Sequence, residues 1–153
     1  MPEAIVIADT SCLIVLTRID ALTVLQSLYG QLYITEEVAA EYGEPLPDWI
    51  KVEAVKDRRF FHVLLSVLDP GEASSLALAL ELKDVLLIVD EFKGRKEALR
   101  LGIKITGTLG LLVKAKQEGI ISQLRPVLHQ LNTAGFRISE ALAEEILKQA
   151  GEN

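Results

Sequence analysis

Two aspartates each follow a short apolar run, Asp9 after residues 4–8 (AIVIA) and Asp90 after residues 85–89 (VLLIV). An uninterrupted apolar run of this length, rich in Ile and Val, is typical of a parallel strand buried on both faces. Ligands of an open α/β sheet bind beyond the carboxyl ends of its strands. If these two strands are neighbours, the two carboxylates therefore meet at one edge of the sheet, where they can act together.

Two glutamates are placed to join this pair from predicted helices. Glu41 follows Val38 by three positions and lies at the border of the apolar face that Val38 and Tyr42 form. Glu72 begins a row with i, i+4, i+7 and i+8 spacing whose other members are all apolar: Leu76, Ala79 and Leu80. An acidic side chain on such a row needs a reason, so Glu41 and Glu72 are candidate partners of the two aspartates.

Several carboxylates in one partly buried mouth repel each other unless a cation compensates their charge. The chain has one cysteine and two histidines that form no ligand pair, so the available ligands are oxygens, which favour Mg²⁺ or Mn²⁺. We expect a metal site held by Asp9, Glu72 and Asp90, with Glu41 as a further catalytic residue. Such a cation polarises a phosphate oxygen and lowers the pKa of a bound water. The chemistry indicated is metal-assisted hydrolysis of a phosphodiester.

Each of these acids also has a simpler interpretation as a structural residue. Asp9 and Asp90 are N-cap residue types at the start of a predicted helix. Glu72 completes a capping box with Asp69, and Glu41 alone is a solvated helix residue. The two roles are compatible, because a capping carboxylate can still offer an oxygen to a metal. The coincidence of two strand ends with two helix faces favours the metal site.

Basic residues follow the second acidic strand end. Lys93 and Arg95 lie in the first turn after Asp90 and are candidates to bind the phosphates of RNA. The other Lys and Arg residues nearby are interpreted as a solvated helix face. The pattern RRFF at residues 58–61 pairs charge with aromatics as a single-strand binder does, although such phenylalanines more often lie in a core. Thr108 is expected to cap its helix, and its hydroxyl could also face the acids.

These residues need a sheet and helices to position them. Strands are predicted over residues 4–8, 32–34, 51–55, 85–89 and 103–106, and helices over 12–17, 21–28, 36–42, 60–68, 73–82 and 92–101, with three more from Thr108, Ser122 and Ser139. Apolar strands that alternate with helices predict a central parallel sheet with helices on both faces, a three-layer α/β/α domain. We expect residues 1–153 to form one domain, with the C-terminal helices from about residue 122 packed on it.

Composition bounds the class of protein. The chain has 153 residues, 50% hydrophobic and 25% charged, which suits one domain with a real core and excludes a mostly disordered chain. Its formal net charge of −6 argues against binding nucleic acid by bulk positive charge, although a cation among the acids would neutralise part of it. Cys12, the only cysteine, is expected to be a small buried hydrophobe. Without a disulfide or an apolar run of membrane-spanning length, we expect a cytoplasmic protein.

Four segments together resemble the PIN-domain family. They are IADTSCLIVLTRI at residues 7–19, ITEEVAAEY at 34–42, DPGEASSLALALE at 69–81 and LLIVDEFKGRKEALRLGIKITGTLGLLVKAKQEGII at 86–121. The likeness extends from Ile5 to about Leu147 and is closest to a prokaryotic branch that is similar to VapC-type toxin ribonucleases. The resemblance implies a metal-dependent ribonuclease, a homodimer and, for the toxins, a small antitoxin protein that blocks the crevice.

The resemblance carries the acidic positions of the family onto four residues of this chain: Asp9, Glu41, Glu72 and Asp90. It also places a supporting hydroxyl on Ser11. Family members commonly have a further aspartate beside or shortly after the last strand-end acid, and here the neighbour is Glu91. The longer side chain can still reach a metal or a water, but it alters the place where a second metal is expected.

The leading hypothesis is therefore a Mg²⁺- or Mn²⁺-dependent endoribonuclease that cleaves single-stranded or structured RNA, with the toxin of a toxin–antitoxin pair as its biological form. The competing hypothesis is a PIN-like scaffold that binds RNA or a protein partner with weak or no cleavage, and Glu91 motivates it. A receiver-type signalling domain is a third class, but its paired early acids and its mid-sheet phosphoacceptor with a lysine are not evident in the sequence.

Overall fold

A computed structural model describes residues 5–152, and within that range the chain forms five strands and nine helices. The strands are β1 (Ile5–Ala8), β2 (Leu32–Thr35), β3 (Ile50–Glu53), β4 (Val85–Ile88) and β5 (Lys104–Thr106). The helices are α1 (Thr10–Arg18), α2 (Thr23–Tyr29), α3 (Glu36–Tyr42), α4 (Arg58–Leu64), α5 (Pro70–Glu81), α6 (Phe92–Arg100), α7 (Thr108–Gln117), α8 (Arg125–Thr133) and α9 (Glu140–Gln149). Among these described helices, none has the length and apolar content needed to span a bilayer.

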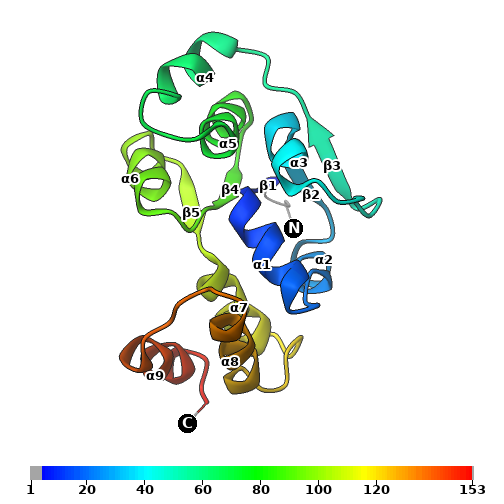
Figure 1. Cartoon of the computed structure of the whole chain (residues 1–153), viewed down its shortest axis with the longest axis vertical. Helices are drawn as coiled ribbons and strands as arrows, with labels where there is room; N and C mark the ends of the chain where they lie inside the picture. Colours follow the sequence, from blue (N-terminus) through cyan, green and yellow to red (C-terminus); the bar gives the residue numbers. More distant parts are fainter. Residues whose placement is uncertain (1–4, 153) are drawn as a thin grey trace.

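The strands of the described chain pair in parallel in the order β3-β2-β1-β4-β5 (Figure 1). Ala8 of β1 lies opposite Ile88 of β4, so these two strands end together at one edge of the sheet. The expectation that the strands before Asp9 and Asp90 are neighbours is thus confirmed. The first predicted strand position, Ala4, lies outside the described residues.

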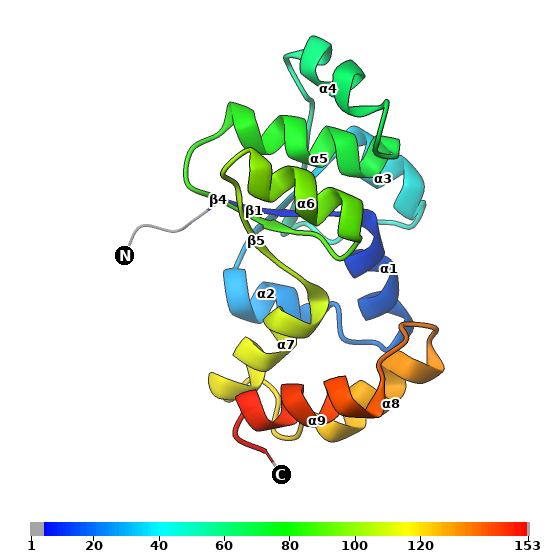
Figure 2. The ribbon, with the colours of Figure 1, turned by 90° about the vertical axis from the view of Figure 1, so that its left-hand side faces the viewer.

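Successive residues of β1 pack into opposite layers, as the pleat of a strand requires. Val6 and Ala8 belong to a core formed with α1, α2 and α7, whereas Ile7 belongs to a core formed with α4, α5 and α6. Figure 2 shows α5 and α6 on one side of the strands and α2 and α7 on the other. The predicted three-layer α/β/α architecture is confirmed.

The C-terminal helices extend the first of these two cores. Leu128 and Leu131 of α8 and Ile146 of α9 are buried in the same cluster as Val6 and the apolar face of α1. In Figures 1 and 2 these helices lie beneath α1 and α7, away from α4 and α5. The C-terminal helices therefore pack into the layer of α1, α2 and α7 and not into that of α4, α5 and α6.

Two predicted boundaries in the middle of the chain are wrong. The strand predicted over residues 51–55 is β3 at Ile50–Glu53, and the helix predicted over 60–68 is α4 at Arg58–Leu64. The helix begins earlier because the carboxylate of Asp57 caps it by accepting from the backbone N–H of Arg59. It ends earlier because the chain turns at Ser66, whose hydroxyl donates to the carbonyl of Val63 (2.8 Å).

The helix predicted from Ser122 begins instead at Arg125. Its cap comes from the far end of the chain, where the carboxylate of Glu152 accepts from the backbone N–H groups of Leu124 (2.7 Å) and Arg125 (3.0 Å). Pro126 lies in the first turn, where its missing N–H costs nothing. The side chain that caps α8 is therefore that of Glu152, which is distant in sequence, and not that of the nearby Ser122.

Candidate active site

Asp9 lies at the carboxyl end of β1, where its side chain is only 4% exposed. It is the N-cap of α1, and its Oδ1 accepts from the backbone N–H of Thr10 (2.6 Å), so the capping interpretation is confirmed. Burial raises the pKa of Asp9 to about 7; the Thr10 bond opposes this rise, and the charges of Glu72, Asp69 and Glu41 add to it. The fold thus holds an acid that is poised between its two protonation states near neutral pH.

Glu41 projects from the last turn of α3 to join two other helices. Its Oε1 accepts from the hydroxyl of Thr10 (2.6 Å), and its Oε2 accepts from the backbone N–H of Gly71 (3.1 Å). A Cβ at Gly71 would overlap Oε1 of Glu41 and would come within 2.9 Å of the Thr10 hydroxyl oxygen. Gly71 therefore leaves room for the carboxylate of Glu41 to bridge α1 and α5, although Glu41 is otherwise exposed. The bridge reaches α1 at Thr10, the residue that follows Asp9.

The predicted capping box of Asp69 and Glu72 at the start of α5 is confirmed. Its backbone N–H donates to Oδ1 of Asp69 (2.9 Å), and its Oε1 accepts from the backbone N–H of Asp69 (3.3 Å). The residue is buried, and burial raises its pKa, with the charges of Asp69, Glu91 and Glu41 acting in the same direction and the backbone bond of Asp69 against it. The side chain of Glu72 thus caps α5 and also lies among other acidic side chains.

Asp90 follows β4 but turns toward a different helix from the one expected. Its Oδ1 accepts from the backbone N–H of Thr108 (2.7 Å) and its Oδ2 from the Thr108 hydroxyl (2.6 Å), at the start of α7. The N-cap of α6 is Glu91, which makes no side-chain capping bond. The alternative interpretation of Asp90 as the cap of the helix after it is therefore wrong, because both of its oxygens accept from Thr108 instead. The expectation that Thr108 caps its helix is also wrong, because the N-cap of α7 is Gly107 and the buried hydroxyl of Thr108 donates to Asp90 instead.

The basic candidates occupy two different environments. Arg95 is half-buried, and its Nη1 donates to the carbonyl oxygen of Val89 (2.9 Å), which holds the guanidinium beside the end of β4. Lys93, by contrast, is exposed on α6. Ser11 and Glu91 are also exposed, so they remain free to meet a ligand from solvent. Of these residues, Arg95 is the one that the fold holds in place.

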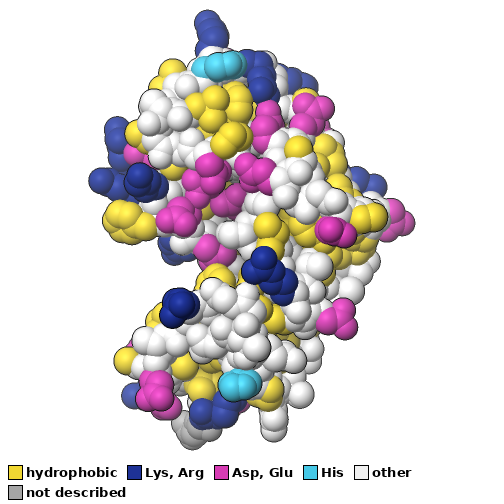
Figure 3. Space-filling view, in the orientation of Figure 1, with side chains coloured by type: hydrophobic (Ala, Val, Ile, Leu, Met, Phe, Trp, Pro, Cys, Tyr) yellow, Lys and Arg dark blue, Asp and Glu magenta, His cyan; other side chains and the backbone are white. Residues whose placement is uncertain are grey.

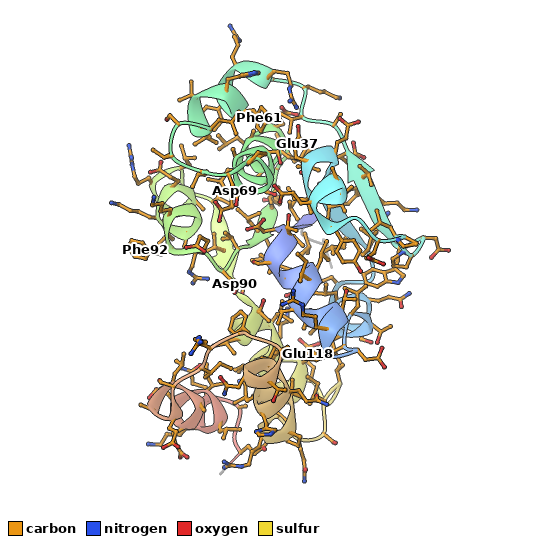
Figure 4. All side chains as sticks on the ribbon, viewed as in Figure 1. Glu37, Phe61, Asp69, Asp90, Phe92 and Glu118 are labelled. Carbon is orange, nitrogen blue, oxygen red and sulfur yellow. The ribbon has the colours of Figure 1, made fainter. Side chains whose placement is uncertain are left out.

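Three acids raise the pKa of Asp9, of Glu72 or of both, and together with these two residues we name them the acidic cluster: Asp9, Glu41, Asp69, Glu72 and Glu91. Figure 3 shows acidic side chains gathered in the middle of one face, above a hollow, and Figure 4 shows Asp69 and Asp90 on that same face. Within residues 5–152 no member of the cluster forms an ion pair. Its negative charge is therefore not compensated by Lys or Arg side chains of the described chain.

Sequence reasoning missed two members of this arrangement. Asp69 was assigned only to its capping box, although its charge raises the pKa of both Asp9 and Glu72. The sequence patterns indicate no role for Thr10 in the site, although its hydroxyl donates to Glu41. Their positions in the sequence could have indicated both residues, because Thr10 directly follows Asp9 and Asp69 precedes Glu72 by three positions.

The candidate ligands are of the type that a hard cation prefers, but they do not surround a single point closely enough to form a complete metal site. All of the candidate ligands are carboxylates, which Mg²⁺ and Mn²⁺ prefer. Across residues 5–152, no three His, Cys, Asp or Glu side chains stand together in a ready-made metal site. Cys12 is fully buried as expected, and burial raises the pKa of its thiol, so it offers no thiolate ligand. A cation here would be held by few carboxylates, with water completing its shell.

Comparison with known proteins gives one match. A family model described as DUF3368: PIN domain matches residues 5–152. No curated protein and no solved structure matches the chain. The match covers every element that positions the acids, from β1 to the residue that caps α8.

Proposed function

Because the chain belongs to the PIN-domain family, we propose that it is a Mg²⁺- or Mn²⁺-dependent endoribonuclease that hydrolyses RNA phosphodiester bonds. PIN domains are generally nucleases, and they typically use divalent metal ions. The observation that carries the proposal is the buried Asp9 among like charges at the carboxyl edge of a parallel sheet. A divalent cation is the ligand that relieves such repulsion.

We assign the cation to Asp9, Glu72 and Asp90, which would hold it directly or through water. Asp9 and Glu72 are the two acids whose surroundings raise their pKa, so they gain most from a positive charge. Mg²⁺ commonly takes one or two protein carboxylates and keeps several waters, which agrees with the open spacing of these acids. When bound, the ion supplies a Lewis acid for a phosphate oxygen and lowers the pKa of a bound water.

The surrounding residues orient the acids and the substrate. Thr10 fixes the carboxylate of Glu41 and Thr108 fixes that of Asp90, so neither acid needs to reorganise when RNA arrives. We assign Arg95 and Lys93 to the phosphate chain on the other side of Asp90. No side-chain nucleophile is required, because water attacks the phosphorus.

Cleavage assays with matched variants test this function. Purified protein is incubated with a mixture of RNAs and Mn²⁺, beside Asp9→Asn, Asp90→Asn and the control Asp48→Asn, which changes an exposed loop aspartate. We expect cleavage by the wild type and the control and its loss in the two site variants. Cleavage that survives both site substitutions would refute the site assignment.

A PIN-like scaffold without activity is the alternative that two observations favour. Glu91 stands where family members commonly have an aspartate, and the described residues hold no ready-made metal site. This alternative predicts RNA or protein binding without metal-dependent cleavage of any RNA in the same assay. A Glu91→Asp variant that gains cleavage would place the defect at that position.

The resemblance of the sequence motifs to VapC-type proteins motivates a proposal for the biological role. We propose that the protein acts in the cytoplasm as a toxin, and that it is a homodimer whose crevice a small antitoxin blocks. Expression should then slow growth of the host, and Asp9→Asn should relieve the effect. Light scattering should give twice the chain mass of 16.8 kDa. Unimpaired growth at verified soluble expression contradicts toxicity in that host, and a mass of one chain contradicts the dimer.

A further inference from the structure

A pocket of about 460 Å³ opens beside Asp90, between the carboxyl edge of the sheet and the C-terminal helices. Its wall on the sheet side includes Asp90, Arg95 and Gly107, and its opposite wall includes Phe136 and Arg137 from the loop between α8 and α9. This volume lies within the roughly 300–1,000 Å³ of typical small-molecule sites. Figure 3 shows the molecule hollowed between its sheet-bearing part and its C-terminal part, next to the acidic side chains.

The sheet-side wall holds a guanidinium without an acidic partner. Arg95 is fixed by its bond to the carbonyl oxygen of Val89, and within the described residues it forms no ion pair. A Cβ on Gly107 would stand 2.9 Å from Nη1 of Arg95 and 2.9 Å from Oδ1 of Asp90. Glycine at this position thus keeps open the space between a positive and a negative group, which a side chain would fill.

The opposite wall is formed by the loop between α8 and α9, which is held by hydrogen bonds from backbone N–H groups on both sides of Arg137. The backbone N–H of Phe136 donates to the carbonyl of Leu131 (2.9 Å), and that of Ile138 donates to Oδ1 of Asn132 (2.8 Å). Arg137 is exposed, and in residues 5–152 it too has no carboxylate partner. Phe136 is half-buried against the core and lines the pocket with the rest of its surface. The loop therefore presents a cation and an aromatic ring in a defined place.

We propose that this pocket binds one unpaired nucleotide of the RNA strand, next to the phosphate that is cleaved, with Arg95 and Arg137 on its phosphate and Phe136 against its base. The proposal rests on the proposed function, which defines the cleaved phosphate. Guanidinium groups match phosphate geometry, and bases stack on aromatic rings regardless of sequence. The acids and the two arginines then face different parts of one substrate strand.

The shape and charge of the pocket favour a single strand of RNA over the other candidate ligands. A base must leave its stack to enter a pocket, which a loop or a single strand allows and a duplex resists. The net charge of −6 disfavours a ligand that coats the whole surface, so local cations must select it. An acidic protein segment would pair with the arginines but has no use for an aromatic ring beside them.

Equilibrium binding without cleavage tests the pocket. All measurements are made in the Asp9→Asn background without divalent cations, with fluorescence anisotropy of a short labelled single-stranded RNA and of the same RNA as a duplex. The variants are Arg137→Gln and Phe136→Leu, the latter keeping apolar bulk while removing the ring. The matched control is Arg59→Gln, which neutralises an arginine with a 94% exposed side chain on α4.

Arg137→Gln should weaken binding of the single strand by about tenfold, as expected for one hydrogen-bonded charge. It should also reduce the dependence of log K on log salt by about 0.7, the value for one phosphate contact on a single strand. Phe136→Leu should weaken binding by about fivefold or more, with an unchanged salt dependence, because stacking releases no counterions. The duplex should bind more weakly than the single strand, and Arg59→Gln should match its parent.

Several results would overturn the inference. These are equal binding by Arg137→Gln and its parent, equal loss in Arg59→Gln, equal affinity for duplex and single strand, or no binding of RNA by the parent. Because Arg137 is exposed, its variant should keep the thermal unfolding temperature of the parent, so a fall in affinity is not a folding defect. RNA binding that depends on Arg137 in a protein that never cleaves would uphold the pocket and reject the nuclease. If instead the wild type cleaves RNA and both Arg137→Gln and Phe136→Leu cleave it equally well, the nuclease function is upheld and the pocket is rejected.

Discussion

Replacing Asp9 by Asn removes a buried charge while keeping a side-chain oxygen that can accept from the N–H of Thr10. The pKa of Asp9 is about 7 in the fold and 3.8 in an unstructured chain, a difference of about 3 units. Each unit corresponds to about 1.4 kcal/mol, so the ionisation of Asp9 costs the folded state about 4 kcal/mol once the pH exceeds both values.

The sign of the pH dependence follows from proton binding. Between about pH 4 and pH 7 the folded protein holds a proton on Asp9 that the unfolded chain has released, so stability falls as the pH rises through this window. Wild type and Asp9→Asn should therefore be similarly stable at pH 4. At pH 8 without divalent cations, the variant should be more stable by up to about 4 kcal/mol, or roughly 8–16 °C in Tm for a domain of this size. The charges of Glu72, Asp69 and Glu41 face Asp9 and contribute to the same trend.

Thermal and urea unfolding at pH 4, 6 and 8, with and without Mn²⁺, measure this difference. Mn²⁺ should raise the Tm of the wild type at pH 8 and leave that of Asp9→Asn nearly unchanged, because a ligand of the folded state stabilises it only where it binds. Asp48→Asn is the control and should follow the wild type. An Asp9→Asn variant that keeps the wild-type pH dependence would refute the reasoning.

Three further predictions concern the residues around this acid. Thr108→Val should lower the free energy of unfolding by about 1–3 kcal/mol, because Asp90 loses a hydroxyl donor in a half-buried place, and urea titration should show it. Gly71→Ala should reduce both Tm and RNA cleavage, because the added Cβ would displace Glu41 from its bridge, whereas unchanged cleavage would show that the bridge is dispensable. Cys12 should not react with a thiol reagent in the folded protein and should react after denaturation, since its thiol is buried and has a raised pKa.

The elements that could be predicted from sequence are those determined by near neighbours along the chain. β1 and β4 are recognisable because a strand buried on both faces has an uninterrupted apolar run. The starts of α3 and α5 are recognisable because the capping side chains of Thr35 and Asp69 bond to groups only three residues away. The pairing of β1 with β4, by contrast, was only a condition of the sequence argument, and the structure meets that condition.

The features that could not be predicted depend on contacts between distant residues. Asp90 bonds to Thr108, 18 positions later, instead of capping the helix next to it. The start of α8 is determined by Glu152, whose bond to Leu124 spans 28 positions. The pocket beside the acids requires Arg137 to fold back against the sheet edge. Periodicity and capping patterns contain no information on such partners, because they describe one element at a time.

The two bonds between Asp90 and Thr108 connect the start of α7 to the candidate active site. Both oxygens of the acid are held by the first residue of this helix, and the same helix leads toward α8 and α9. A displacement of the first turn of α7 would therefore either move Asp90 with it or break both bonds. A change at α7 would thus alter the position of Asp90 without any contact to the acidic cluster.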